Sequence, residues 1–455
     1  MRPSVSLFLT ALLGLAPVDA VRAAPVSNAS HAVKVELKVW QLANGLQVIF
    51  CPHRKVPAVT VQLWYHVGSK DERVGVRGVA HMFEHMMFKG SRHVRPEEHA
   101  RMISAVGGNT NAFTSEDVTA YHNTLPRQYL DFALRLEADR MRHFVLTDQT
   151  IASEREVVKE EKRLRLENSP IGRSLEAIHA LSFTRHSYAW TPAGEIADLN
   201  QTKKDFYQRF YDTYYVPNNA TLIVVGDVDE QEVRKSVARY FDPVPKGKAP
   251  PRVSLVEPAQ TALREKRADW PSQLNVVLGA YHIPEAKHPD FLPLQVLSTI
   301  LSGGRASRLY QTIVRKGKLA LEAGGFAMPR EHPGLFFVYG VGLPNHDLEK
   351  LRAALFAELS RVTKSGVTAK ELEKAKNQLA TQHLRGLRTL YGLAYQIGMS
   401  TYLEGDPGAF LTEVKRLERV TTKDVQRVAG TYLTDANLNL LLLPASSAKA
   451  KGGAR

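Results

Sequence analysis

Two histidines and a glutamate stand close together in the stretch HMFEHMMFKG, residues 81–90. On an α-helix, His81 and His85 project from the same face one turn apart, and Glu84 lies at the edge of that face. Two imidazoles in this arrangement can both reach one Zn²⁺ at about 2.0–2.1 Å, while the glutamate stays outside the ligand shell and close to a bound water. The residues alone also allow a second interpretation, in which both histidines are hydrogen-bonded core residues of an apolar helix.

A catalytic zinc ion usually takes three protein ligands and keeps one position open. Candidates for the third ligand lie in the charge-dense helical stretch SEREVVKEEKRLRLEN, residues 153–168. Glu154 and Glu161 are seven residues apart, which places them two turns apart on one helix face. Glu160 is rotated from that face by about 100° and is the poorer candidate. Taken alone, such a charge run is more typical of a solvated helix face.

The elements that must position these residues occur twice along the chain. Each half begins with strand-like runs, continues with a helical run ending in a glycine cap, and closes on a strand after a tyrosine-containing turn. The stretches are residues 46–50, 58–68, 78–90 and 214–229 in the first half, and 273–283, 290–304 and 431–444 in the second. This weak duplication predicts an α+β fold of two homologous domains, each a mainly antiparallel sheet covered by helices.

A Pro- and Lys-rich stretch, DPVPKGKAPPRVSL, interrupts the pattern near the middle of the chain. We therefore expect an N-terminal domain at residues 36–243, a linker at 244–256 and a C-terminal domain at 257–445. The second half has no histidine or glutamate where the first half has its cluster. The chemistry is therefore expected in the first half.

The N-terminal segment, residues 1–23, has the pattern of a signal peptide. Arg2 precedes an apolar run from Val5 to Ala16, and small residues follow up to Ala23, after which we expect cleavage. That run is too short to span a bilayer, and no later apolar run reaches roughly 18 residues. We therefore expect an exported, periplasmic protein without a transmembrane segment.

The chain is basic, with a formal net charge of +14, but no arginine-rich patch with interleaved aromatics suggests a nucleic-acid groove. Cys51 is the only cysteine, so an internal disulfide is excluded and the hydrophobic cores must stabilise the fold.

Several motifs together resemble the pitrilysin family of zinc peptidases, which includes insulin-degrading enzyme and the mitochondrial processing peptidase. The stretch GVRGVAHMFEHMMFKGS contains His-x-x-Glu-His, the inverse of the commoner zinc-protease order, and Glu161 follows His85 by 76 residues in the context EREVVKEE. The stretches VGSKDE, GGNTNAFTSEDVTAYHNTLP, HSYAWTPAGEIADL and YYVPNNATLIVVGDVD resemble further markers of this family. The resemblance covers residues 36–445 and is to the short, two-domain members.

The resemblance implies a role for each candidate residue. His81, His85 and Glu161 would bind one Zn²⁺ per chain, and Glu84 would be the general base that activates water for attack on a peptide carbonyl. Glu154 would be a second carboxylate that supports the site. The implied activity is that of an endopeptidase acting on peptides or unfolded protein segments.

The stretch GGNTNAFT resembles the strand edge to which the family's peptide substrates add. Asn111 and Ala112 are the residues that we expect to contact the substrate backbone. An ordinary β-turn, with Asn present for local reasons, is the alternative. The resemblance further implies that the two domains form a clam-like half chamber.

The second half departs from the family pattern at two positions. Many members carry an arginine there and, seven residues later, a tyrosine, which approach the substrate carbonyl from across the chamber. In the matching stretch SRLYQTIVRKGKLALEAGG, counting from Ser307 places Val314 and Leu321 at these positions. Arg315 is displaced by one residue, which on an α-helix turns the side chain by about 100°.

This departure predicts a heterodimer in which a homologous subunit supplies the arginine and the tyrosine, with a homodimer as the next alternative. A different class of function is a non-catalytic scaffold or chamber subunit, as in relatives that became structural subunits of respiratory complexes. Those relatives typically lose zinc ligands, whereas this chain keeps the whole set and Glu84.

Overall fold

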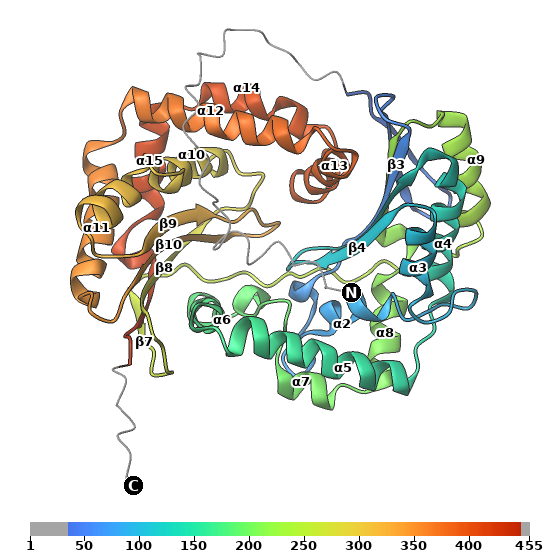
Figure 1. Cartoon of the computed structure of the whole chain (residues 1–455), viewed down its shortest axis with the longest axis horizontal. Helices are drawn as coiled ribbons and strands as arrows, with labels where there is room; N and C mark the ends of the chain where they lie inside the picture. Colours follow the sequence, from blue (N-terminus) through green and yellow to red (C-terminus); the bar gives the residue numbers. More distant parts are fainter. Residues whose placement is uncertain (1–34, 447–455) are drawn as a thin grey trace.

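The computed structural model describes residues 35–446, which build two β-sheets with helices packed on their faces (Figure 1). The predicted signal peptide, residues 1–23, lies outside the described residues. The first sheet has the strand order β1-β2-β6-β3-β5-β4, and the second has the order β7-β11-β8-β10-β9. In chain order, the strands are β1 (Lys38–Gln41), β2 (Gln47–Pro52), β3 (Ala58–Tyr65), β4 (Asn109–Thr114), β5 (Thr119–Pro126), β6 (Ala220–Gly226), β7 (Arg264–Arg267), β8 (Asn275–Ile283), β9 (Glu322–Ala327), β10 (Gly334–Gly342) and β11 (Leu438–Leu443).

The two sheets share one topology. In the first sheet, β6 pairs in parallel with β2 and antiparallel with β3, and the antiparallel order continues through β5 to β4. In the second sheet, β11 pairs in parallel with β7 and antiparallel with β8, followed by β10 and β9. Among the described strands, β1 alone has no counterpart. The repeat confirms the predicted α+β class with two similar units, while the exact domain limits stay a prediction.

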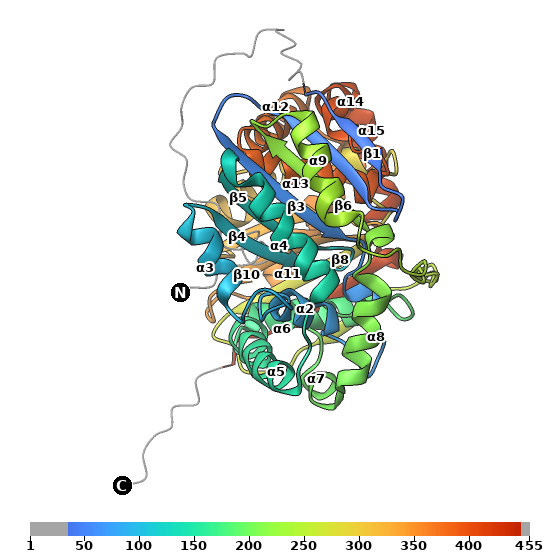
Figure 2. The same ribbon diagram turned by 90° about the vertical axis from the view of Figure 1, so that its right-hand side faces the viewer.

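Helices cover both sheets, and Figure 2 shows α4 lying across the strands of the first sheet. The helices of the first half are α2 (Val79–Met86), α3 (Glu98–Ala105), α4 (Leu130–His143), α5 (Asp148–Lys162), α6 (Pro170–Ser182), α7 (Ile196–Gln201), α8 (Lys204–Tyr214) and α9 (Glu230–Phe241). Those of the second half are α10 (Phe291–Ser302), α11 (Leu348–Ser365), α12 (Ala369–Gly386), α13 (Leu390–Glu404), α14 (Glu413–Arg419) and α15 (Thr422–Tyr432).

Shorter helical turns complete the described fold. Two are π-helices, η3 (Arg163–Glu167) and η6 (Tyr310–Lys316). The others are 3-10 turns: η1 (Ser69–Asp71), η2 (Arg127–Tyr129), η4 (Ser187–Ala189), η5 (Pro217–Asn219), η7 (Ala409–Thr412) and η8 (Asp435–Asn437). Within residues 35–446, no helix is both long and apolar enough to cross a membrane.

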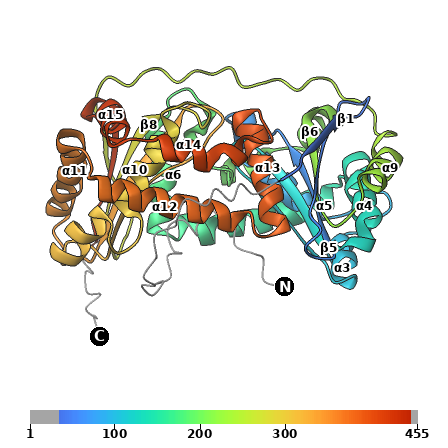
Figure 3. The same cartoon turned by 90° about the horizontal axis from the view of Figure 1, so that it is seen from above.

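The connection between α9 and β7 contains no helix or strand, and Figure 3 shows it crossing along one side of the molecule from the first half to the second. The predicted left-handed glycine cap is wrong for the first helical run and is confirmed for the second. Helix α2 ends at Met86 with Met87 as its C-cap, so Gly90 lies beyond the helix. Helix α10 has Gly303 as its C-cap, and the next residue, Gly304, has a left-handed φ of 81°.

Each half contributes one helix to the sheet of the other half. On α13, residues Leu390, Leu393, Ala394 and Ile397 recur at helical spacing and pack on the face of the first sheet that carries Trp64. Conversely, α6 packs on the second sheet, where Ile178 lies in the same core cluster as alternate residues of β8. The strands β3 and β8 are therefore buried on both faces, which explains their long apolar runs.

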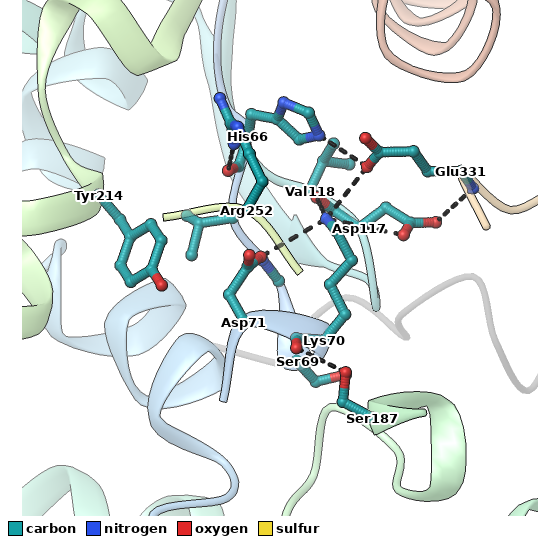
Figure 4. A network of polar contacts seen from close by, with 12 residues as sticks. His66, Ser69, Lys70, Asp71, Asp117, Val118, Ser187, Tyr214, Arg252 and Glu331 are labelled. Atoms are coloured by element: carbon teal, nitrogen blue, oxygen red, sulfur yellow. Dashed lines mark hydrogen bonds and ion pairs between the residues drawn. The ribbon is translucent and has the colours of Figure 1, made fainter. Parts of the chain in front are cut away.

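A buried ion network also joins the two halves (Figure 4). The Lys70 side chain is 2% exposed, and its ammonium lies 3.5 Å from Asp71, 3.7 Å from Asp117 and 3.2 Å from Glu331. Glu331 comes from the loop between β9 and β10 of the second half and also pairs with His66 at 2.6 Å. Because a buried charge is costly without its partners, this network holds the loop in one position against the first half.

A second buried pair lies beside this network. The Arg330 Nη2 atom is 2.7 Å from Glu116 Oε2, and the two side chains are 9% and 2% exposed. The backbone N–H of Glu331 donates a hydrogen bond to Asp117 Oδ2 at 3.2 Å. Glu116 and Asp117 form the turn between β4 and β5, so the second half holds the turn at the end of β4.

Candidate metal centre

Helix α2 presents two different faces. Val79, Met82, Phe83 and Met86 are buried in the core of the first half, which leaves the predicted site residues on the face toward α5. The helix begins after Gly78, whose φ of 94° is left-handed. The buried Glu72 carboxylate accepts hydrogen bonds from the Gly78 and Ala80 amides at 2.8 and 2.7 Å, and so satisfies two backbone donors at the start of the helix.

The structure brings His81, His85 and Glu161 together. Their potential ligand atoms all lie within 4.8 Å of one another. The Nε2 atom of His85 is 3.3 Å from Glu161 Oε2, and that of His81 is 4.0 Å from the same oxygen. The two imidazole rings are nearly perpendicular, with centroids 4.9 Å apart. Ligands that each bind zinc at about 2.0–2.1 Å can be at most about 4 Å apart, so these separations suit a single ion.

Neither ring nitrogen of His81 makes a hydrogen bond. Its Nδ1 atom is buried without a hydrogen-bond partner, and its Nε2 atom is too far from Glu161 for a hydrogen bond. Burial, with a smaller contribution from His85, lowers the pKa of His81 to about 3, so the imidazole is neutral near pH 7 and offers a lone pair. The nitrogen that faces Glu161 is Nε2, and it would be the atom that binds a metal ion.

The other ligands form a coupled pair. Burial lowers the pKa of His85, but hydrogen bonds with Glu154 and Glu161 outweigh that effect and raise it to about 9. Burial raises the pKa of Glu161, but His85, His81 and Arg165 outweigh it and lower the pKa to about 2. In the absence of a cation, the site is therefore held by an imidazolium–carboxylate pair.

Glu154 lies behind His85. Its Oε2 atom is 3.7 Å from His85 Nδ1, and its Oε1 atom is 3.0 Å from the Lys89 ammonium. The Glu154 side chain is only 2% exposed. Burial raises its pKa, but His85 and Lys89 more than offset this, so the carboxyl is held as a carboxylate. This contact orients the ring of His85, as carboxylates commonly do for histidines that bind zinc.

Glu84 lies on the same helix and points toward the end of β4. Burial raises the pKa of its carboxyl, while His85 and the Thr114 hydroxyl oppose the increase. Glu160, by contrast, pairs with Arg163 and is 58% exposed. Of the two neighbouring glutamates on α5, Glu161 therefore faces the histidines and Glu160 faces solvent.

The relative position of α2 and α5 is fixed by a backbone contact. Lys162 follows Glu161, is 3% exposed, and donates a hydrogen bond to the Gly194 carbonyl at 2.6 Å. Gly194 packs against the start of α2 so closely that an added Cβ atom would lie 2.3 Å from the Gly78 nitrogen. The end of α5 is thereby tied to the beginning of α2.

The predicted substrate-binding residues lie on β4, which forms an edge of the first sheet. Asn111 is opposite His122 and Ala112 is opposite Tyr121 of β5. The alternative of an ordinary β-turn is therefore wrong for residues 109–114, while substrate contact stays a prediction.

The residues of the second half lie as follows. Val314 packs against the second core, and Leu321 is 52% exposed. Arg315 donates a hydrogen bond to Gln311 at 3.3 Å. Because η6 is a π-helix, the rotation of about 100° per residue expected of an α-helix does not describe this segment.

Sequence reasoning missed two basic residues of the site. Lys89 contacts Glu154, and Arg165 forms an ion pair with Glu161. Arg165 has a sequence signal, because it lies four residues after Glu161. Lys89 lies beyond the end of α2 and contacts a residue of α5, so no helical spacing indicates it.

Comparison with protein families gives two matches along the chain. Residues 48–189 match the family model described as insulinase (peptidase family M16), and residues 202–379 match the model described as peptidase M16 inactive domain. The second description agrees with the absence of a His and Glu cluster from the second half.

Individual relatives agree. The chain is 33% identical to the zinc protease PqqE of Helicobacter pylori, over 95% of this chain and 98% of the relative. It is 27% identical to a probable mitochondrial-processing peptidase subunit beta of Arabidopsis thaliana, over 89% of this chain and 77% of the relative. The crystal structure of a protease from Helicobacter pylori superposes with a TM-score of 0.86 at 30% identity, covering 90% of this chain and 99% of that one.

Proposed function

This chain belongs to the insulinase family, peptidase family M16, and we propose that it is a zinc-dependent endopeptidase that cleaves peptides or unfolded protein segments. One observation carries the proposal: ligand atoms of His81 and His85 from α2 and of Glu161 from α5 all lie within 4.8 Å of one another. These three residues would hold the zinc ion, and Glu154 would keep the ring of His85 in its binding orientation.

Zinc, when bound, supplies water of lowered pKa and polarises a peptide carbonyl. The protein supplies the proton transfers. Glu84 lies one residue before His85 on the helix that carries both histidines, so its carboxylate can accept a proton from the attacking water and return it to the leaving amine. Burial raises the pKa of the Glu84 carboxyl, which strengthens it as a proton acceptor.

β4 would bind the substrate. An extended peptide can add to this edge of the first sheet, with backbone hydrogen bonds to Asn111 and Ala112 that do not depend on the substrate's side chains. Such pairing needs an unfolded segment, which favours peptides over folded proteins. The turn at the end of β4 is held by Arg330 and Glu331, so the strand would meet substrate in a fixed position.

A homologous partner subunit would complete the site. Val314 and Leu321 offer no polar group toward a substrate carbonyl, so a heterodimer in which the partner supplies an arginine and a tyrosine fits the chain best. A homodimer using Arg315 is the alternative. The predicted signal peptide would direct the chain to the periplasm, and the crystal structure of the periplasmic protease PqqL of Escherichia coli shares the fold at a TM-score of 0.72.

The test combines metal content with turnover. The purified chain should bind one zinc at the site on α2 and α5 and cleave internally quenched peptides, alone or after addition of a homologous subunit encoded nearby. Glu84→Gln should keep the metal and lose turnover by at least about 10²-fold. A wild-type chain that binds zinc but cleaves no peptide under either condition would instead indicate a scaffold subunit.

A further inference from the structure

A second cluster of metal-binding side chains lies outside the site described above. His93, Asp139 and His143 offer three ligand atoms that all lie within 4.8 Å of one another. His93 belongs to the loop that follows α2, and the other two residues lie four apart in the last two turns of α4. That spacing places Asp139 and His143 on one helix face.

The backbone fixes this loop against the end of α4. The Arg92 amide donates a hydrogen bond to the His143 carbonyl at 2.8 Å, and Ser91 forms an isolated antiparallel bridge with Phe144. The Val145 amide donates to the Gly90 carbonyl at 3.4 Å. His93 is therefore held opposite α4 although its side chain is 62% exposed.

The side chains already form a polar cluster. The Nδ1 atom of His93 is 2.5 Å from Asp139 Oδ1, and Ser91 Oγ hydrogen bonds to the other carboxylate oxygen. The imidazoles of His93 and His143 are nearly perpendicular, with centroids 5.3 Å apart. The Asp139 side chain is 9% exposed, so its orientation is set by these contacts.

The electrostatic surroundings favour a cation in part. His143 is the last residue of α4, and the C-terminal end of a helix stabilises positive charge. Arg92 and Arg142 also lie near His143, and their positive charges oppose cation binding. The affinity should therefore be lower than that of the site on α2 and α5.

We propose that His93, Asp139 and His143 form a second site for a divalent transition-metal ion, with Zn²⁺ as the expected ion. Two imidazoles and one carboxylate suit zinc and its neighbours rather than Mg²⁺ or Ca²⁺. Ligands of one tetrahedral zinc lie about 3.3 Å apart, so the exposed His93 must move outward as the ion replaces the hydrogen between it and Asp139. The bound ion would clip the loop after α2 to α4.

The test is metal stoichiometry on the untagged chain after chelation and dialysis. Titration with Zn²⁺ alone, with Co²⁺ absorption as a second readout, should give two sites in the wild type. The double variant His81→Ala/His85→Ala should keep one site, and His93→Ala/His143→Ala should keep the other. The variant with all four substitutions should bind none. Arg142→Ala, next to a proposed ligand, is the matched control and should retain two sites.

A separate readout is thermal unfolding. In the His81→Ala/His85→Ala background, added Zn²⁺ should raise the unfolding midpoint, and His143→Ala should abolish that increase. Ser91→Ala should weaken binding at the second site by about 10- to 100-fold. Circular dichroism checks that the His81→Ala/His85→Ala variant is folded. If the folded variant binds no metal, the second site does not exist. That result would leave the proposed peptidase function untouched, because the site on α2 and α5 is tested separately.

Discussion

Replacing Arg330 by methionine should destabilise the protein by up to about 3 kcal/mol at pH 7. The substitution removes the partner of Glu116, whose side chain is 2% exposed and lies next to Asp117. The unpaired carboxyl must then stay charged in a buried position or take up a proton. For a carboxyl with an ordinary pKa of 4.5, protonation costs about 1.4 kcal/mol per pH unit above that value, and because burial already raises the pKa of Glu116 in the wild type, about 3 kcal/mol is the upper limit of the added cost at pH 7. This limit lies at the lower end of the cost of breaking a buried pair, about 3–5 kcal/mol.

The same reasoning fixes the sign of the pH dependence. In the wild type, burial already raises the pKa of Glu116 although Arg330 opposes the increase. In the Arg330→Met variant the folded-state pKa rises further, so the folded variant binds the proton up to a higher pH than the folded wild type does. The deficit relative to the wild type should be small near pH 4.5, should grow as the pH rises, and should be less than about 1 kcal/mol at pH 5. Urea unfolding followed by circular dichroism at several pH values measures it.

A double-mutant cycle provides the control. Glu116→Gln removes the charge, so the variant Arg330→Met/Glu116→Gln should recover most of the stability lost by Arg330→Met at pH 7. The reasoning is refuted if the double variant is as unstable as the sum of the single variants, or if the deficit of Arg330→Met does not change between pH 5 and pH 7.

Three further predictions concern the site and the contact between the halves. Glu161→Gln should abolish zinc binding at the site on α2 and α5, whereas Glu160→Gln should leave that site intact, as measured by the loss or retention of one bound zinc per molecule; the reverse result would place the wrong glutamate at the site. Lys89→Met should lower zinc affinity by about 10- to 100-fold because Glu154 loses its ammonium partner, and Lys89→Arg should restore it. Burial raises the pKa of Glu331, but His66 and Lys70 outweigh it and lower the pKa to about 2. The stabilising contribution of Glu331 is therefore complete above about pH 4.5 and is lost as the pH falls toward 2. In the Glu331→Gln variant, the measured free energy of unfolding should therefore change less with pH in that window than in the wild type.

Periodicity made much of the site predictable. A four-residue and a seven-residue spacing place side chains on one helix face whatever the surrounding fold is, and both α2 and α5 kept these spacings. The preference for Glu161 over Glu160 also followed from helix geometry. The glycine cap at Gly90 failed because cap signals fix a helix end only to within a few residues, and α2 ended at Met86 instead.

The exchange of helices between the halves could not be predicted in the same way. The apolar stripe of α13 predicts that this face of the helix is buried, but it does not indicate which of the two sheets covers it. Gly398 allows the close approach of α13 to the first sheet, since an added Cβ would lie 2.3 Å from the ring of Trp64. A single glycine in a helix does not, however, predict which residue packs against it. The π-helical form of η6 was equally hidden, because its residues have no spacing that distinguishes it from an α-helix.

The site geometry is set by contacts that involve no metal. Glu72 holds the first amides of α2, and Lys162 ties the end of α5 to Gly194, which itself touches Gly78 at the start of α2. Each of these contacts is buried and lies within a few residues of a proposed ligand. A small metal domain often needs its ion to fold, because nothing else brings the ligands together. Here the end of α5 is already joined to the start of α2, so the free energy of metal binding is not needed to bring the two helices together.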